Sequence, residues 1–119
     1  MAFKFWFPTQ IYDAPLLARE PEAFTRAWNE ECSRIRDTDE AGRSWCVENY
    51  PGGHTSYGTL RNLHRTMQSF TTLEERIWTH VRRFCNGLDL DLREANLAMT
   101  DCWVNIMTEG GAHMLHAHA

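Results

Sequence analysis

The sequence predicts an α+β fold, because helical patterns with apolar stripes come first and a β-branched, aromatic stretch follows them. Apolar residues after Pro21 recur at spacings of three and four, the period of one helix face. A second helical region extends from about Leu60 to Gly87, and the pattern changes to alternation at Leu97. The 119 residues are enough for one domain, residues 1–119, with a core of its own.

Composition narrows the class of protein. Hydrophobic residues make up 43% and charged residues 24%, which is typical of a globular chain. The net charge of −4 and the lack of a basic block argue against nucleic acid as a partner. No apolar run reaches the ~18 residues of a membrane span, and the opening residues lack the features of a signal peptide. We therefore expect a soluble, cytoplasmic protein whose four singly spaced cysteines are free thiols.

The first helix is predicted to begin at Pro21, since proline is favoured at the first helical position. Its apolar stripe consists of Phe24, Trp28, Cys32 and Ile35. Residues 37–42 are expected to end it, and residues 43–60 are interpreted as a loop with a turn at Pro51 and Gly52. In this loop His54 and Ser56 are expected to be hydrogen-bonded turn residues rather than a catalytic pair.

Two helices are predicted in the next region. The first has the stripe Leu60, Leu63, Met67 and Phe70. Thr72 and Glu75 have the spacing of a capping box and predict a second start, and Asn86–Gly87 predict its end. The buried face of this second helix is expected to be Leu73, Ile77, Val81, Phe84 and Leu88.

Extended segments are predicted at both ends of the chain. Residues 3–16 alternate aromatic and polar side chains up to and beyond Pro8, as in an edge strand. Residues 97–107 form the clearest strand, with Trp103 expected in the core and Asn105 on the same face. There Asn105 can hydrogen-bond either an oxygen-rich co-substrate or neighbouring backbone. A glycine turn at Gly110 then leads into a second strand, and we expect the helices to pack on this sheet.

Three histidines near the end of the chain form the strongest chemical signal. On a strand, His116 and His118 project to one face with their backbones roughly 6–7 Å apart, whereas His113 faces the other way. Two neutral imidazoles at this spacing can converge on iron, zinc, nickel or copper. The alternative is a histidine-bearing terminus without a metal. The spacing Gly110-x5-His116-x-His118 after a strand favours the metal, because it matches the opening of a cupin-type pattern.

Longer segments carry a more specific resemblance. The stretches "FPTQIY", "NYPGGHTSYGTL", "CWVNIM" and "HAHA", in this order, resemble a mostly bacterial family of 2-oxoglutarate- and iron(II)-dependent oxygenases that is similar to prolyl hydroxylases. The resemblance implies a double-stranded β-helix, a jelly-roll barrel supported by N-terminal helices. It also implies that residues 1–119 are the N-terminal part of a longer protein and are inactive alone. In the wider superfamily a carboxylate stands two residues after the first histidine, where this chain has His118.

The expected function is thus that of an iron(II)- and 2-oxoglutarate-dependent dioxygenase or hydroxylase acting with O₂ on a substrate that the sequence does not identify. His116 and His118 are the expected metal ligands, and Asn105 is the expected contact to 2-oxoglutarate. Strands beyond the chain would supply the third ligand and the carboxylate clamp. Two alternatives stay open: a cupin-type metalloenzyme that does not use 2-oxoglutarate, and a non-enzymatic interaction domain.

Overall fold

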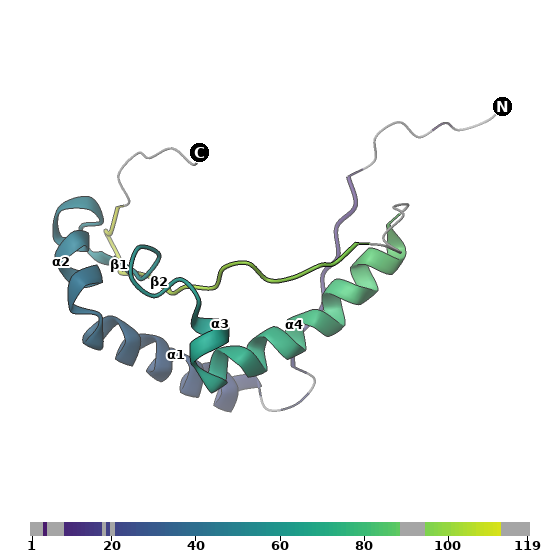
Figure 1. Ribbon diagram of the computed structural model, residues 1–119, viewed down its shortest axis with the longest axis horizontal. Coiled ribbons are helices and arrows are strands. Elements are labelled where there is room, and N and C mark those ends of the chain that lie inside the picture. Colours follow the sequence, from purple (N-terminus) through teal and green to yellow (C-terminus); the bar gives the residue numbers. More distant parts are fainter. Residues whose placement is uncertain (1–3, 5–8, 18, 20, 89–94, 113–119) are drawn as a thin grey trace.

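A computed structural model describes residues 4, 9–17, 19, 21–88 and 95–112 of the chain (Figure 1). The predicted α+β class is confirmed: these residues form four helices and one two-stranded antiparallel sheet. The elements are α1 (Pro21–Thr38), α2 (Glu40–Asn49), β1 (Gly53–Thr55), α3 (Leu63–Thr66), α4 (Gln68–Gly87) and β2 (Asn105–Met107). In Figure 1, α1 and α4 form the lower side of the molecule, and the sheet lies above them beside α2. None of the helices described has both the length and the apolar character needed to cross a bilayer.

The helix predicted to begin at Pro21 is confirmed as α1. The prediction of a loop for residues 43–60 is wrong in its first part, because residues up to Asn49 belong to α2. Asp39 follows α1 directly, and its Oδ1 accepts a hydrogen bond from the backbone N–H of Gly42 at 3.0 Å. This N-cap satisfies one of the free N–H groups at the start of a helix and begins α2. Among the described residues, α2 buries only Gly42 and Cys46, so its sequence has no long apolar stripe that would indicate a helix.

The break between α3 and α4 falls at Met67, not at the capping box predicted for Thr72 and Glu75. Met67 is extended, with φ −130° and ψ 125°, and α4 begins at the next residue. Thr72 and Glu75 therefore lie inside α4. The end predicted at residues 86–87 is confirmed, because α4 ends at Gly87.

The hydrophobic core is small and lies where α1, α3, the start of α4 and β2 meet. Its buried members are Ile35, Leu63, Phe70 and Val104. Trp28 packs against it, with its ring centroid 4.6 Å from that of Phe70. Ile77 and Val81, expected to be central, are only half-buried and are not part of this cluster. The helices do pack on the β2 region as predicted, but α4 does so through its first turn.

The strand predicted for residues 97–107 is shorter than expected, and the opposite face of this segment is buried. Only β2 is a strand, pairing with β1 so that His54 lies opposite Ile106 and Thr55 opposite Asn105. Val104 is 5% exposed, whereas Trp103 is 39% exposed and contacts the Tyr57 ring edge-on. The prediction of Trp103 as a core residue is therefore wrong, because packing against α1 and α3 selects Val104 and Ile106 for the inner face.

The N-terminal strand is not found in residues 9–16, the part of that prediction that the structure describes without a gap. These residues are irregular and reach α4 through Tyr12. The Tyr12 hydroxyl and Nδ1 of His80 are 2.8 Å apart, and the Tyr12 ring lies 6.3 Å from that of Phe84. Side-chain contacts to α4 thus take the place of strand pairing in this segment.

The four cysteines are free in the structure. Burial raises the pKa of the Cys32 and Cys102 thiols, which keeps both protonated and unreactive near neutral pH. Both pack against the core cluster, as expected of cysteine acting as a small apolar residue.

Two glycines hold the turn after α2 against the turn after β2. Gly52 has φ 73°, and a Cβ placed on it would lie 3.0 Å from Cα of Gly111. The backbone N–H of Thr108 donates to the carbonyl of Gly52, and that of Ala112 donates to Pro51. The close approach of these backbones requires glycine at both positions.

Replacing Gly52 with alanine should therefore lower the free energy of unfolding by roughly 1–2 kcal/mol, the typical cost of forcing a non-glycine residue into the left-handed region. Gly58→Ala is the matched control, because nothing lies within 4 Å of a Cβ built there. Its effect should stay within about 0.5 kcal/mol. Urea denaturation followed by circular dichroism measures both, and equal effects would contradict the predicted role of Gly52.

Candidate functional site

Of the residues predicted to form the site, the structure describes Asn105 but not the histidines. His113, His116 and His118 lie outside the described residues. Asn105 is the first residue of β2, and its side chain is exposed. It is on the sheet face opposite to Val104 and Ile106, so it can contact a molecule from outside the core.

The turn that precedes the histidine segment is well defined. Gly110 has φ 77°, and the backbone N–H of Gly111 donates to the carbonyl of Thr108 at 2.9 Å. The N–H of Ala112 then reaches the carbonyl of Pro51 at 3.1 Å. The glycine turn predicted after the strand is confirmed, and Ala112, the last residue described, lies beside the Pro51–Gly52 turn.

A polar cluster that the sequence did not predict lies next to this turn. His54 is only 2% exposed, and its Nε2 lies 3.5 Å from Oδ2 of Asp39. The same carboxylate oxygen accepts a hydrogen bond from Oγ1 of Thr59 at 2.7 Å. A Cβ on Gly42 would collide with the Asp39 carboxylate, so α2 can approach this group only with glycine there. The only sequence signal for the cluster was the cap spacing from Asp39 to Gly42.

Ser56 is also buried, and its role is structural. Its Oγ accepts from the backbone N–H of Val104 at 3.1 Å and donates to the carbonyl of Leu60 at 3.2 Å. These bonds join the loop after β1 to Val104, the core residue that precedes β2. The expectation that Ser56 is a hydrogen-bonded structural residue, and not the nucleophile of a hydrolase, fits this geometry. His54 differs, because neither of its ring nitrogens has a hydrogen-bond partner in the described part of the chain.

The environment of His54 lowers its pKa from 6.5, chiefly through burial. Asp39 and Asp37 act in the opposite direction, while Arg36 and Arg43 lower the pKa further. The imidazole is therefore neutral at pH 7.

His54 should accordingly make the protein less stable in acid. Because its pKa is lower when folded, the unfolded chain binds the proton first as the pH falls through about 6.5. The contribution of neutral His54 to the free energy of unfolding is fully present above this pH and is lost below it. One group can lower the free energy of unfolding by at most about 1.4 kcal/mol per pH unit. In His54→Gln this part of the decline should disappear. Urea midpoints at several pH values measure it, and an NMR titration that places the His54 pKa above 6.5 would refute the prediction.

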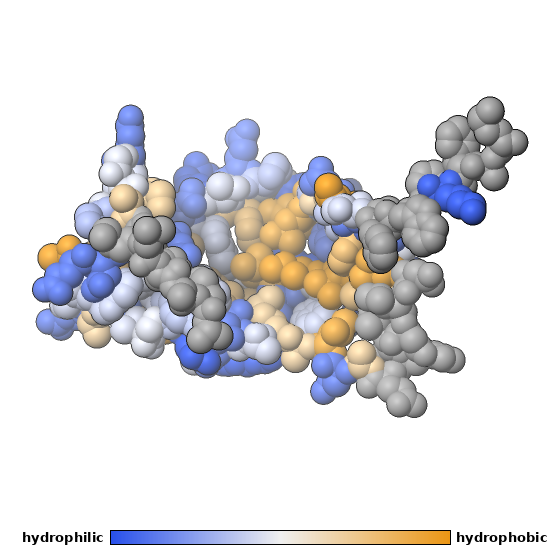
Figure 2. Space-filling model, turned by 90° about the horizontal axis from the view of Figure 1, so that it is seen from above, coloured by the Kyte–Doolittle hydropathy of each residue, from blue (hydrophilic) through white to orange (hydrophobic). Residues whose placement is uncertain are grey.

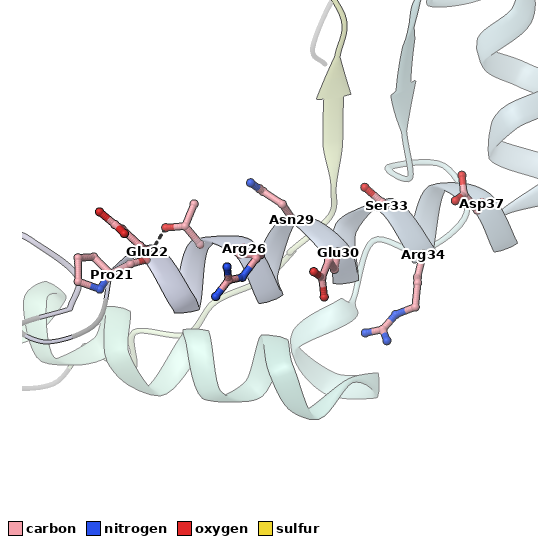
Figure 3. Close-up of a pocket in the computed structure, with 9 residues that line it drawn as sticks. Pro21, Glu22, Arg26, Asn29, Glu30, Ser33, Arg34 and Asp37 are labelled. Carbon is pink, nitrogen blue, oxygen red and sulfur yellow. Dashed lines mark hydrogen bonds between the residues drawn. The ribbon is translucent and has the colours of Figure 1, made fainter.

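Two cavities flank α2. One, of about 350 Å³, lies between α2 and the loop after β1 and has Trp45 and Tyr57 among its lining residues. The other, of about 390 Å³, is lined by Arg36, Arg43, His54 and the Pro51–Gly53 turn. A larger depression runs along α1, but all the residues that line it belong to this helix (Figure 3). It is therefore part of the surface of a single helix and not a cavity between elements.

No family model, curated protein or solved structure matches the chain. Within the residues that the structure describes, no group of three or more histidine, cysteine, aspartate or glutamate side chains is placed to hold a metal. The predicted ligands His116 and His118 lie outside the residues in which such a group was sought.

Proposed function

We propose that this chain is the N-terminal part of an iron(II)- and 2-oxoglutarate-dependent oxygenase with a jelly-roll barrel. The observation that carries the proposal is the turn at Gly110. It directly follows the paired strand β2 and directly precedes the histidine segment, which is the setting that the Gly110-x5-His116-x-His118 pattern requires. The proposed activity is inferred from the family resemblance.

The helices support the barrel part of this proposal. α1, α3 and α4 pack on the Val104 side of the chain, and Leu97, Trp103 and Met107 remain exposed. Figure 2 shows apolar side chains gathered in the middle of the face seen from above, with polar residues around them. The further strands that the resemblance implies would pack on such a surface.

His116 and His118 would hold the iron, because two neutral imidazoles on one strand face suit this metal. Iron and 2-oxoglutarate, when bound, supply the oxidising chemistry, and the protein contributes ligands, orientation and exclusion of water. Asn105 would donate its amide N–H to a 2-oxoglutarate oxygen from the exposed face of β2.

Asn105→Ala in the full-length protein should raise the KM for 2-oxoglutarate by about tenfold, the effect of losing one hydrogen bond to a charged group. Its iron content should not change. Asn96→Ala, which removes another exposed asparagine, is the matched control and should leave the KM unaltered. A succinate-release assay measures both. Turnover that does not depend on 2-oxoglutarate would favour the cupin-type alternative, and absence of metal and turnover would favour an interaction domain.

A further inference from the structure

The cavity beside the Pro51–Gly53 turn brings basic side chains from two helices together with the buried histidine of β1. Arg36 near the end of α1 and Arg43 of α2 line it along with His54. Of the described residues that line this cavity, none is acidic. The space of about 390 Å³ is sufficient for a small molecule or ion.

Among the residues that the structure describes, neither ring nitrogen of His54 has a hydrogen-bond partner. A neutral imidazole has one N–H donor and one acceptor, and buried groups of this kind are usually hydrogen-bonded. Oδ2 of Asp39 lies 3.5 Å from Nε2, but no hydrogen bond joins the two side chains. The Asp39 carboxylate is already bonded to Thr59 Oγ1 and to the N–H of Gly42. His54 therefore has hydrogen-bonding capacity left for a ligand.

Arg36 and Arg43 also have N–H donors that are not used in the hydrogen bonds described below. Nε of Arg36 donates to Oδ1 of Asp37 at 2.8 Å, and Nη1 of Arg43 donates to the carbonyl of Asp37. Each guanidinium carries five N–H donors, so most of them are not used in these contacts. The planar arrangement of these donors suits the oxygens of a carboxylate or phosphate.

We propose that this cavity binds a small oxyanion, either a carboxylate or a phosphate, held by Arg36 and Arg43 and by the ring N–H of His54. Two arginines oppose binding of a cation, so a metal is not the expected occupant. The anion would give His54 the hydrogen-bond partner that the described residues do not provide. This site uses residues other than the proposed metal ligands and does not depend on the proposed function.

Calorimetric titrations with inorganic phosphate and with succinate test the proposal, both with a chelator present so that metal plays no part. At least one of them should bind saturably at one site per chain. Binding should weaken about tenfold in Arg43→Gln, and similarly in Arg36→Gln, through loss of a charge-assisted hydrogen bond. Arg34→Gln is the control: it removes the same charge from the exposed side of α1, where Arg34 pairs with Glu31.

NMR provides a second readout, in which the His54 ring resonances of the parent should shift as the anion is added. Stronger binding of phosphate or of succinate identifies which oxyanion the site prefers. No saturable binding of either anion would overturn the proposal. So would undiminished binding in both cavity variants, or an equal loss in Arg34→Gln, which would indicate general charge attraction. Because no metal is present, these results are independent of whether the protein binds iron.

Discussion

Phe70→Ala should destabilise the protein by about 3–5 kcal/mol, the usual cost of truncating a fully buried phenylalanine. Phe70 is 2% exposed and packs its ring on Trp28 within a core that has few other buried members. The cavity left by the substitution would lie between α1 and α4, where Phe70 meets Trp28. Urea denaturation followed by tryptophan fluorescence measures the loss. Complete loss of the cooperative transition would fit the same prediction.

Phe84→Ala is the matched control, because it removes the same atoms from the far end of the same helix. Phe84 is only half-buried and contacts Tyr12 rather than the core cluster. Its substitution should cost less than half as much, since less apolar area returns to water. A cost equal to that of Phe70→Ala would mean that the core extends along the whole of α4, as the stripe with Ile77 and Val81 had suggested.

His116→Ala or His118→Ala should abolish stoichiometric iron in the full-length protein, and with it 2-oxoglutarate turnover. A catalytic metal site usually has three protein ligands, and loss of one typically destroys tight binding. Affinity should also fall as the pH drops toward 6, because imidazole must be neutral to bind metal. Elemental analysis and succinate release measure the two effects.

His113→Ala is the comparison for these variants, since on a strand it faces away from the other two histidines. It should retain most of the iron. Equal losses in all three variants would show that the segment is not a regular strand. Full retention in all three would mean that the histidines have no role in metal binding.

The elements that the sequence predicted correctly carry local signals. Pro21 and the apolar stripe through Ile35 predict α1 without reference to the rest of the chain. Gly110 predicts its turn because glycine readily adopts the positive φ that the structure has there. α2 was missed because it buries only two residues and its chief signal is the Asp39 cap. Local signals therefore predict where an element begins or ends better than they predict a weakly amphipathic helix.

Contacts between distant parts of the chain determine the features that the sequence alone did not predict. Alternation alone cannot tell which face of a strand is buried, and the size of Trp103 favoured the wrong face. The contacts of α1 and α3 settled the choice for Val104. The cluster of His54 with Asp39 was missed for a related reason: α2 must fold back beside β1 before these two residues meet.

The central claim is that His116 and His118 bind one iron ion, and X-ray absorption at the iron edge tests it most directly. The account predicts that the full-length protein, loaded with one iron(II), shows scattering from at least two imidazoles with nitrogens roughly 2.0–2.2 Å from the metal. One imidazole should be lost in His118→Ala at whatever iron occupancy remains. An iron environment without imidazole, or one that is identical in the parent and in His118→Ala, would contradict the account.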